Sequence, residues 1–167
     1  MTRFEIVPER SELTAEARSS LHPIHGECRG VSGWIDAVVT DGVVDALEPV
    51  NAHLELETGQ LKADNPLIQR EIQRRLDAQR FPTIRADVQQ ATGGPDRYQV
   101  KGMLSLHGVT EAVAGQAKVR VDGDTMTVDG ELTLDIRAFR LDPPKLFGLR
   151  VYPDVAVRLR VHASRVD

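Results

Sequence analysis

The chain has 167 residues, of which 41% are hydrophobic, 28% are charged and 4% are aromatic. This length suits one domain over residues 1–167 with a single sizeable core, and the composition excludes a disordered or collagen-like protein. The net charge of -4 argues against a nucleic-acid binder, which needs a basic surface.

Residues 1–10 lack the apolar run and the small-residue cleavage site of a secretory signal peptide. Cys28 is the only cysteine, which leaves no internal disulfide. No stretch approaches the roughly 18 consecutive apolar residues that cross a bilayer. We therefore expect a cytoplasmic protein that does not span a membrane.

Two histidines, His22 and His25, lie three residues apart in a segment that Pro23 stiffens. Neutral imidazole is a common ligand of zinc and haem iron, so the pair could begin such a site. Residues three apart on a regular strand point to opposite faces, so both could bind one ion only at a bulge or a turn. We therefore expect one imidazole to face inward, where it contacts a ligand head group or serves as a single axial ligand of haem.

A zinc site would need a third ligand from elsewhere in the chain. The other histidines, His53, His107 and His162, fall on the polar faces of predicted strands. Histidines on such a face ordinarily point to solvent. The sequence thus favours no metal and no cofactor, with haem or zinc bound by His22 and His25 as the alternative.

Alternation of apolar and polar residues, the period of a β-strand, dominates the chain. This pattern predicts strands at residues 31–39, 52–57, 84–88, 98–107, 113–121, 126–136 and 155–162. Turn formers such as Asp122-Gly123 separate the strands. Many short strands with one apolar face each, joined by turns, imply a sandwich or a barrel.

The segment after Asp64 predicts a helix instead. Asn65 is a good N-cap, and Pro66 suits the first helical position. Apolar side chains then follow at four-residue spacing and form one narrow stripe: Ile68, Ile72 and Leu76. We expect a helix over residues 66–79 that packs across a barrel opening or against its flank.

Residues 140–153 contain prolines and a glycine among apolar side chains that include Phe147. They predict an apolar loop between the last two strands. A loop of this kind usually plugs a fold or covers a site, so Phe147 is a candidate ligand contact.

Sequence templates for catalysis are missing. The chain has no nucleophile elbow, phosphate-binding loop, dinucleotide fingerprint or H-E-x-x-H pair. Asp122 and Asp124 lie in a turn, where aspartate suits the backbone geometry. These observations favour a binding protein over an enzyme.

Four stretches, taken in chain order, resemble the YceI-like family and together cover nearly the whole sequence. They are residues 19–35 with His25 ahead of Gly33-Trp34, residues 54–84 with the segment Arg80-Phe81-Pro82-Thr83-Ile84, residues 100–113 with Gly102, Leu104, Gly108, Val109 and Thr110, and residues 132–141 with Asp135, Arg137 and Phe139. Arg140 departs from this pattern, because the family usually has glycine there.

The resemblance implies an extended eight-stranded antiparallel β-barrel of lipocalin-like build with one short helix, often as a homodimer. Its interior would hold an isoprenoid or another amphiphile. An eight-stranded barrel is wide enough either to be filled by side chains or to hold one small ligand, and aliphatic lining leaves more room than aromatic lining. Apolar strand residues are the candidate lining: Ile35, Leu54, Leu56, Leu104, Leu106, Leu134 and Ile136.

Two alternatives to an isoprenoid or lipid carrier stay open at this point. The first is a haem-binding or metal-binding barrel that uses His22 and His25, with or without an enzymatic role in a specialised pathway. The second is a barrel with a packed interior that serves only as a dimeric or partner-binding module.

Overall fold

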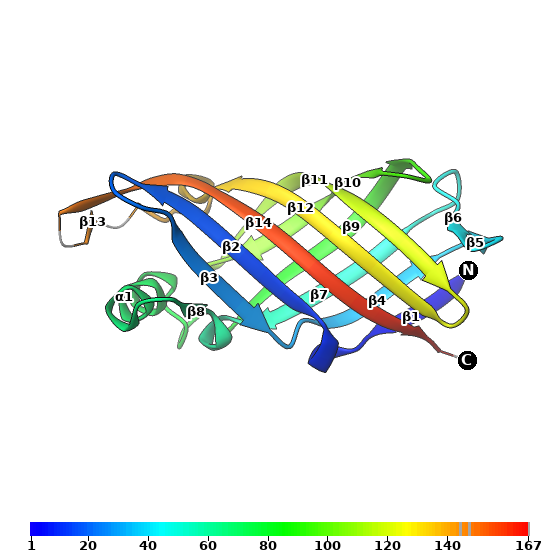
Figure 1. Ribbon diagram of the computed structural model, residues 1–167, viewed down its shortest axis with the longest axis horizontal. Coiled ribbons are helices and arrows are strands. Elements are labelled where there is room, and N and C mark those ends of the chain that lie inside the picture. The colour runs from blue at the N-terminus through cyan, green and yellow to red at the C-terminus, as the bar shows by residue number, and fades with distance from the viewer. Residues whose placement is uncertain (144, 147, 167) are drawn as a thin grey trace.

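The computed structural model describes residues 1–143, 145–146 and 148–166. The chain forms many strands, one α-helix and three short 3-10 turns (Figure 1). The strands are β1 (Thr2–Ile6), β2 (Glu12–Ser19), β3 (Ile24–Arg29), β4 (Ser32–Ala37), β5 (Val39–Thr40), β6 (Val43–Val44), β7 (Asn51–Glu57), β8 (Lys62–Ala63), β9 (Thr83–Gly93), β10 (Tyr98–Leu106), β11 (Val109–Asp122), β12 (Thr125–Asp135), β13 (Lys145–Leu146) and β14 (Leu149–Arg165). The helical segments are η1 (Pro8–Arg10), η2 (Thr58–Gln60), α1 (Pro66–Leu76) and η3 (Ile136–Phe139).

The long strands close into an eight-stranded antiparallel barrel, which confirms the predicted fold class. The ring runs β1, β4, β7, β9, β10, β11, β12 and β14, and β14 pairs back with β1. From β4 to β14 the ring follows the order of the chain, with only the short strands β5, β6, β8 and β13 and helical segments between its members. The chain therefore winds once around a central space.

Two breaks early in the chain set the shape of the barrel, one between β1 and β2 and the other between β3 and β4. β1 and β2 both run along β14, with η1 between them, while β4 pairs with β1 and β3 pairs with β2. β4 continues the ring by pairing with β7, but β3 pairs with the short β8 instead. The barrel is thus closed at the end that holds the termini and opens at the end beside α1 (Figure 1).

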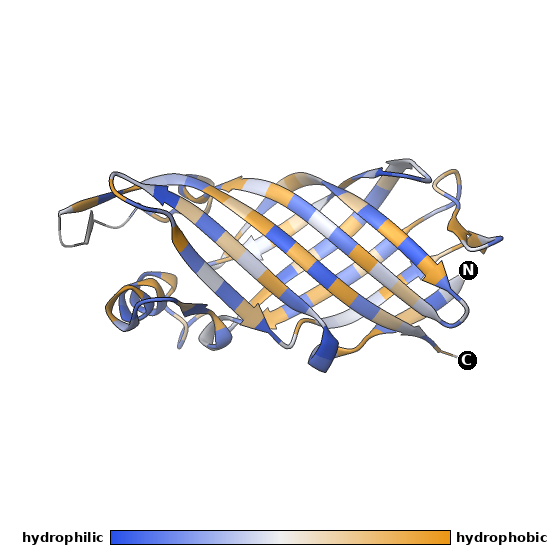
Figure 2. Ribbon diagram, viewed as in Figure 1, coloured by the Kyte–Doolittle hydropathy of each residue, from blue (hydrophilic) through white to orange (hydrophobic). Residues whose placement is uncertain are grey.

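Inward positions on the strands are apolar and outward positions are mostly polar, as the alternating bands in Figure 2 show. Buried side chains that include Phe4, Tyr98, Met126 and Val161 fill the closed end. Aliphatic side chains of α1 pack at the open end against β3, β10 and β14. The middle of the barrel lies between these two clusters.

The helix begins where the sequence predicts. The Asn65 side chain accepts hydrogen bonds from the backbone N–H of Leu67 at 2.8 Å and of Ile68 at 3.4 Å, and Pro66 occupies the first turn. The helix ends at Leu76 rather than at residue 79, because Asp77 takes a left-handed conformation with φ of 51°. Within the described part of the chain, no helix is long and apolar enough to cross a membrane.

The predicted helix position across a barrel opening is confirmed. Ile68 packs with Ile24 and Val151 on one side of the opening, whereas Leu76 packs with Leu106 on the other. The apolar stripe of α1 therefore faces the barrel interior.

Candidate ligand-binding cavity

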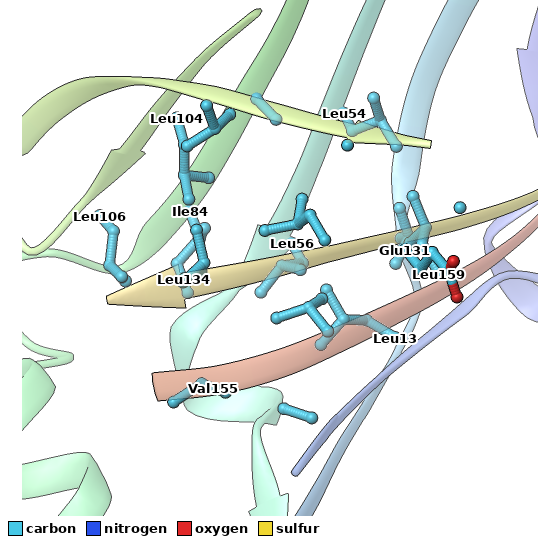
Figure 3. A pocket seen from close by; sticks show the side chains of 18 of the residues that line it. Leu13, Leu54, Leu56, Ile84, Leu104, Leu106, Glu131, Leu134, Val155 and Leu159 are labelled. Atoms are coloured by element: carbon cyan, nitrogen blue, oxygen red, sulfur yellow. The ribbon is translucent and has the colours of Figure 1, made fainter. Parts of the chain in front are cut away.

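The barrel encloses a cavity of about 450 Å³ that runs from Val44 and Tyr98 near the closed end to α1 at the open end. This volume lies in the range of pockets that hold small ligands, roughly 300 to 1,000 Å³. Figure 3 shows aliphatic side chains from several strands converging on the space, among them Leu56 of β7 and Leu134 of β12. A packed interior, one of the alternatives left open by the sequence, is therefore wrong.

Small residues at inward positions leave this space unfilled. Alanine and glycine occupy the lining on most strands, as Ala15, Ala17, Gly26, Ala52, Ala86, Gly102, Gly115, Ala117 and Gly130. At the ~24 cal/mol per Å³ known for buried apolar cavities, a void of about 450 Å³ corresponds to on the order of 10 kcal/mol of missing packing. This is comparable to the whole stability of a typical domain, so a bound apolar molecule would offset a substantial cost.

Two of the inward glycines have different reasons to be glycine. A Cβ on Gly102 would lie 2.1 Å from the backbone oxygen of Asp87, so the close approach of β9 and β10 requires glycine. A Cβ on Gly130 would meet its nearest atoms, in Gln116 and Leu159, only at 3.7 and 3.9 Å. The backbone at Gly130 therefore tolerates a side chain, and the effect of having glycine here is to keep the cavity wide.

The buried polar side chains of the described residues already have hydrogen-bond partners. The Tyr98 hydroxyl is buried at the closed end and donates a hydrogen bond to the backbone oxygen of Val44 at 2.8 Å. Burial, with a smaller effect of Asp45, raises the pKa of Tyr98, so the hydroxyl stays neutral. No buried side-chain nitrogen or oxygen of the described residues lacks a hydrogen-bond partner. Only hydrocarbon matches such a lining.

Charged residues of the barrel wall face outward. Glu131, which Figure 3 draws among the residues around the cavity, has an exposed side chain and lies between the inward positions Gly130 and Leu132. Glu55 lies in the same way between Leu54 and Leu56. The alternation of the strands thus keeps charge out of the cavity.

Polar side chains reach the cavity at the α1 end. Gln69 and Arg75 of α1 belong to the lining there. The Arg75 Nε donates to Glu71 at 2.9 Å, and its Nη1 donates to the backbone oxygen of Asp142 at 3.2 Å. These contacts fix the guanidinium at the rim, where a polar group of a bound molecule could meet it.

All seven aliphatic residues predicted as lining do line the cavity: Ile35, Leu54, Leu56, Leu104, Leu106, Leu134 and Ile136. Their contact with a ligand stays a prediction. Ile136 reaches the cavity from η3 rather than from a strand. Phe147 lies outside the described residues.

The prediction that one of His22 and His25 faces inward is wrong. His22 lies in the bend before β3, so the phase of the strand does not apply to it. His25 lies on the outer face of β3, 3.6 Å from Glu16, because Ile24, Gly26 and Cys28 take the inward positions. Both imidazoles are exposed, and neither lines the cavity.

The remaining histidines do not complete a metal site either. His53 and His162 lie at outward strand positions, as predicted, and His107 lies in the turn after β10. Across the part of the chain that the structure describes, no three His, Cys, Asp or Glu residues form a group that could hold a metal ion.

Sequence reasoning missed two contributions to the cavity. β2 supplies Leu13, Ala15 and Ala17, and α1 supplies the polar rim residues Gln69 and Arg75. The alternation of residues 12–19 was an available signal for β2, although alanines make it weak. Nothing in the sequence distinguishes the rim residues from other polar residues of the helix.

Comparison with known proteins assigns the fold to a family. A family model described as a YceI-like domain matches residues 4–163. Among curated proteins, none matches the sequence significantly.

Several solved structures share the fold. BcnA from Burkholderia cenocepacia superposes with a TM-score of 0.82 at 19% identity, over 95% of this chain and 99% of that chain. A polyisoprenoid binding domain from Saccharophagus degradans, implicated in plant cell wall breakdown, gives a TM-score of 0.78 at 16% identity over 98% of each chain. The Campylobacter jejuni YCEI protein gives 0.65 at 13% identity over 85% of each chain. At these identities the likeness concerns the fold alone.

Proposed function

Because the chain belongs to the YceI-like family, we propose that it binds and carries the hydrocarbon part of an amphiphile, an isoprenoid or another lipid-like molecule. The observation that carries this proposal is the cavity of about 450 Å³, which aliphatic side chains line along the barrel and which the polar side chains of Gln69 and Arg75 reach at the α1 end. The similar domain from Saccharophagus degradans is described as polyisoprenoid binding, which supports an isoprenoid as the first candidate.

The shape of the cavity favours an extended chain over a compact ring system. Its lining on β14 runs from Val151 to Val161. At about 3.3 Å per residue and a strand tilt near 40°, this stretch corresponds to roughly 25 Å along the barrel. A cavity that is long and narrow matches a linear hydrocarbon.

We propose that the hydrocarbon tail of the ligand lies inside the barrel and that its head group lies at the open end. Nothing at the closed end could solvate a head group, since the Tyr98 hydroxyl is already bonded to Val44. Gln69 and Arg75 supply polar atoms at the rim. A head group that accepts hydrogen bonds would lie beside them.

Burial of hydrocarbon is sufficient for useful affinity without any catalytic group. Each buried methylene contributes about 0.8 kcal/mol, so ten of them contribute roughly 8 kcal/mol before the costs of ordering the ligand. A net free energy of about 8 kcal/mol corresponds to a dissociation constant of about 1 μM, so methylenes beyond these ten would offset the ordering costs. We do not propose haem or zinc as a cofactor, because neither His22 nor His25 reaches the cavity.

The test is extraction of the purified protein with organic solvent, followed by mass spectrometry of the extract. A copurified isoprenoid or acyl lipid at about one molecule per chain is the expected result. If the purified protein contains no lipid, it should take up a fluorescent polyprenyl or acyl probe added from ethanol. An empty protein that takes up neither probe would refute the proposal.

A cytoplasmic location and a homodimer, both expected from the sequence or the resemblance, also belong to this proposal. The unpaired Cys28 is compatible with a reducing compartment. Cell fractionation tests the location, and light scattering after size-exclusion chromatography tests the dimer.

A further inference from the structure

We infer that the α1 end of the barrel is a surface that docks on anionic membranes, with Leu21, Leu67 and Tyr152 entering the lipid interface and Arg18, Arg70 and Arg150 contacting the head groups. This inference rests on the proposed function, because a membrane is where a molecule with a long hydrocarbon tail is loaded or released.

Three large apolar side chains are exposed at this end of the molecule. Leu21 in the turn between β2 and β3 is 79% exposed, Leu67 at the start of α1 is 53% exposed, and Tyr152 on β14 is 37% exposed. Figure 1 places the β2–β3 turn, α1 and the start of β14 together at the end away from the termini. Single exposed apolar side chains are common on proteins, but these three share the end of the barrel at which the cavity opens, which makes them candidates for one interaction surface.

The three elements are joined below this surface. Ile24, Ile68 and Val151, from β3, α1 and β14, form one buried cluster. The backbone N–H of Ser20 donates to the backbone oxygen of Arg150 at 2.8 Å, which ties the β2–β3 turn to β14. The exposed side chains therefore project from a single packed base.

Arginines accompany the apolar side chains. The guanidinium carbons of Arg18 and Arg150 lie 5.7 and 5.9 Å from the centre of the Tyr152 ring. Among the described residues, neither arginine forms a salt bridge, and Arg70 on α1 forms none either. A tyrosine between two arginines is the combination that lies at the boundary between head groups and acyl chains.

Two acidic residues near this end already contact other basic side chains. The chain carries a net charge of -4, yet the single Glu71 faces both Arg74 and Arg75, and Glu16 is 3.6 Å from His25. Arg18 and Arg150, which form no salt bridge among the described residues, can therefore contact an external anion. Anionic lipids match this arrangement better than a neutral surface does.

The cavity opens at the same end, which favours a membrane over a protein as the partner. Side chains of α1 line its mouth, whereas packed side chains around Met126 and Val161 fill the opposite end. A ligand tail that leaves the bilayer at the mouth enters the cavity without crossing water. Docking by any other surface would expose the tail during transfer.

The experiment uses the full chain with vesicles of phosphatidylcholine alone or of phosphatidylcholine with roughly 30% of the anionic lipid phosphatidylglycerol. Flotation should recover the protein with the anionic vesicles, and less of it at high salt. The double variants Leu21→Ser/Leu67→Ser and Arg18→Ala/Arg150→Ala should each lower partitioning by about tenfold or more. Wild-type protein that fails to float with anionic vesicles would overturn the inference.

Leu47→Ser and Arg120→Ala are the matched controls. Leu47 is 97% exposed near the closed end, and Arg120 is exposed on the outer face of β11. Both variants should bind vesicles as the wild type does. Equal losses of vesicle binding in the control and α1-end variants would overturn the inference. It would also be overturned if the α1-end variants kept vesicle binding but lost self-association, as measured by sedimentation velocity.

Ligand uptake separates this inference from the proposed function. The α1-end variants should take up a probe added from ethanol as well as the wild type does, but should acquire it from vesicles at least tenfold more slowly. A protein that takes up the probe from ethanol without vesicle binding refutes only the docking surface. A protein that binds vesicles without any uptake refutes only the carrier function.

Discussion

The Nδ1 atom of His53 on β7 lies 2.6 Å from Oδ1 of Asp87, its direct neighbour on β9. Glu55 lies 2.9 Å from the other ring nitrogen, and Trp34 stacks on the ring with centroids 4.6 Å apart. Partial burial, the largest single influence, lowers the pKa of His53, but hydrogen bonds to Asp87 and Glu55 together outweigh it. The net result is a raised pKa.

The raised pKa makes the contribution of His53 to stability depend on pH. The imidazolium stabilises the folded protein fully below the unfolded pKa near 6.5, and this stabilisation is lost as pH rises through the folded pKa. His53→Gln should therefore lower the free energy of unfolding by up to about 1 kcal/mol at pH 5.5 and by less at pH 9. Urea unfolding at both pH values measures the difference. In an Asp87→Asn background the pH-dependent part should shrink, and an unchanged dependence would show that the carboxylate is not its cause.

Gly130→Leu should reduce ligand uptake while the barrel becomes no less stable. Its Cβ has room, and the remainder of the side chain points into the cavity. Removal of a strand glycine and partial filling of the void should raise the free energy of unfolding by about 1 kcal/mol. Thr133→Leu, at an exposed outward position of the same strand and outside the cavity lining, is the control and should leave uptake unchanged. Normal uptake by Gly130→Leu would contradict a ligand in the middle of the barrel.

Gln73→Ala should loosen α1 from the barrel. The Gln73 carboxamide donates to the backbone oxygens of Thr58 at 2.9 Å and Leu61 at 3.0 Å, and these bonds tie α1 to η2. Their loss should lower the free energy of unfolding by about 1 to 2 kcal/mol and speed probe release. Arg74→Ala, a truncation at an exposed position of the same helix, should change both by little. Equal release rates for the two variants would mean that α1 does not control exchange.

Cys28 should resist thiol reagents in the folded protein. Its side chain has no exposed surface, and burial, with a smaller effect of Glu57, raises the pKa of the thiol. Both effects suppress the reactive thiolate at pH 7 to 8. Labelling by a maleimide should be slow in buffer and complete in concentrated guanidinium. Rapid labelling without denaturant would show that β3 opens readily.

Strong alternation allowed most of the barrel to be predicted, whereas β1 and β2 were missed, and weak contrast explains the second of these. The bulky side chains of β10, β12 and β14 mark their inward faces clearly. The inward residues of β2 include Ala15 and Ala17, which differ little in hydropathy from their neighbours. The predicted loop at residues 140–153 is wrong in its last part, because β14 begins at Leu149 and a register shift between Val151 and Val155 breaks the alternation there.

The cavity itself depends on distances that a sequence does not contain. Gly102 and Gly130 look equivalent in the sequence, yet only Gly102 is in close contact with a neighbouring backbone. The orientation of His25 could not be predicted either, because the face on which a residue lies depends on where its strand begins. β3 begins at the inward Ile24, so His25 faces outward. The roles of Gly102, Gly130 and His25 could be interpreted only after the pairing of the strands was known.

The double pairing of β14 has a consequence for how the protein folds. This strand of 17 residues pairs with β12 along one edge and with β2 and β1 along the other. The Ser11 hydroxyl accepts a hydrogen bond from the backbone N–H of His162, 151 positions away. Contacts of such separation form slowly, so the ring stays open until residues 149–165 have been synthesised. During that interval β1 and β12 present unpaired edges to other chains, and the newly made protein is then most prone to aggregate.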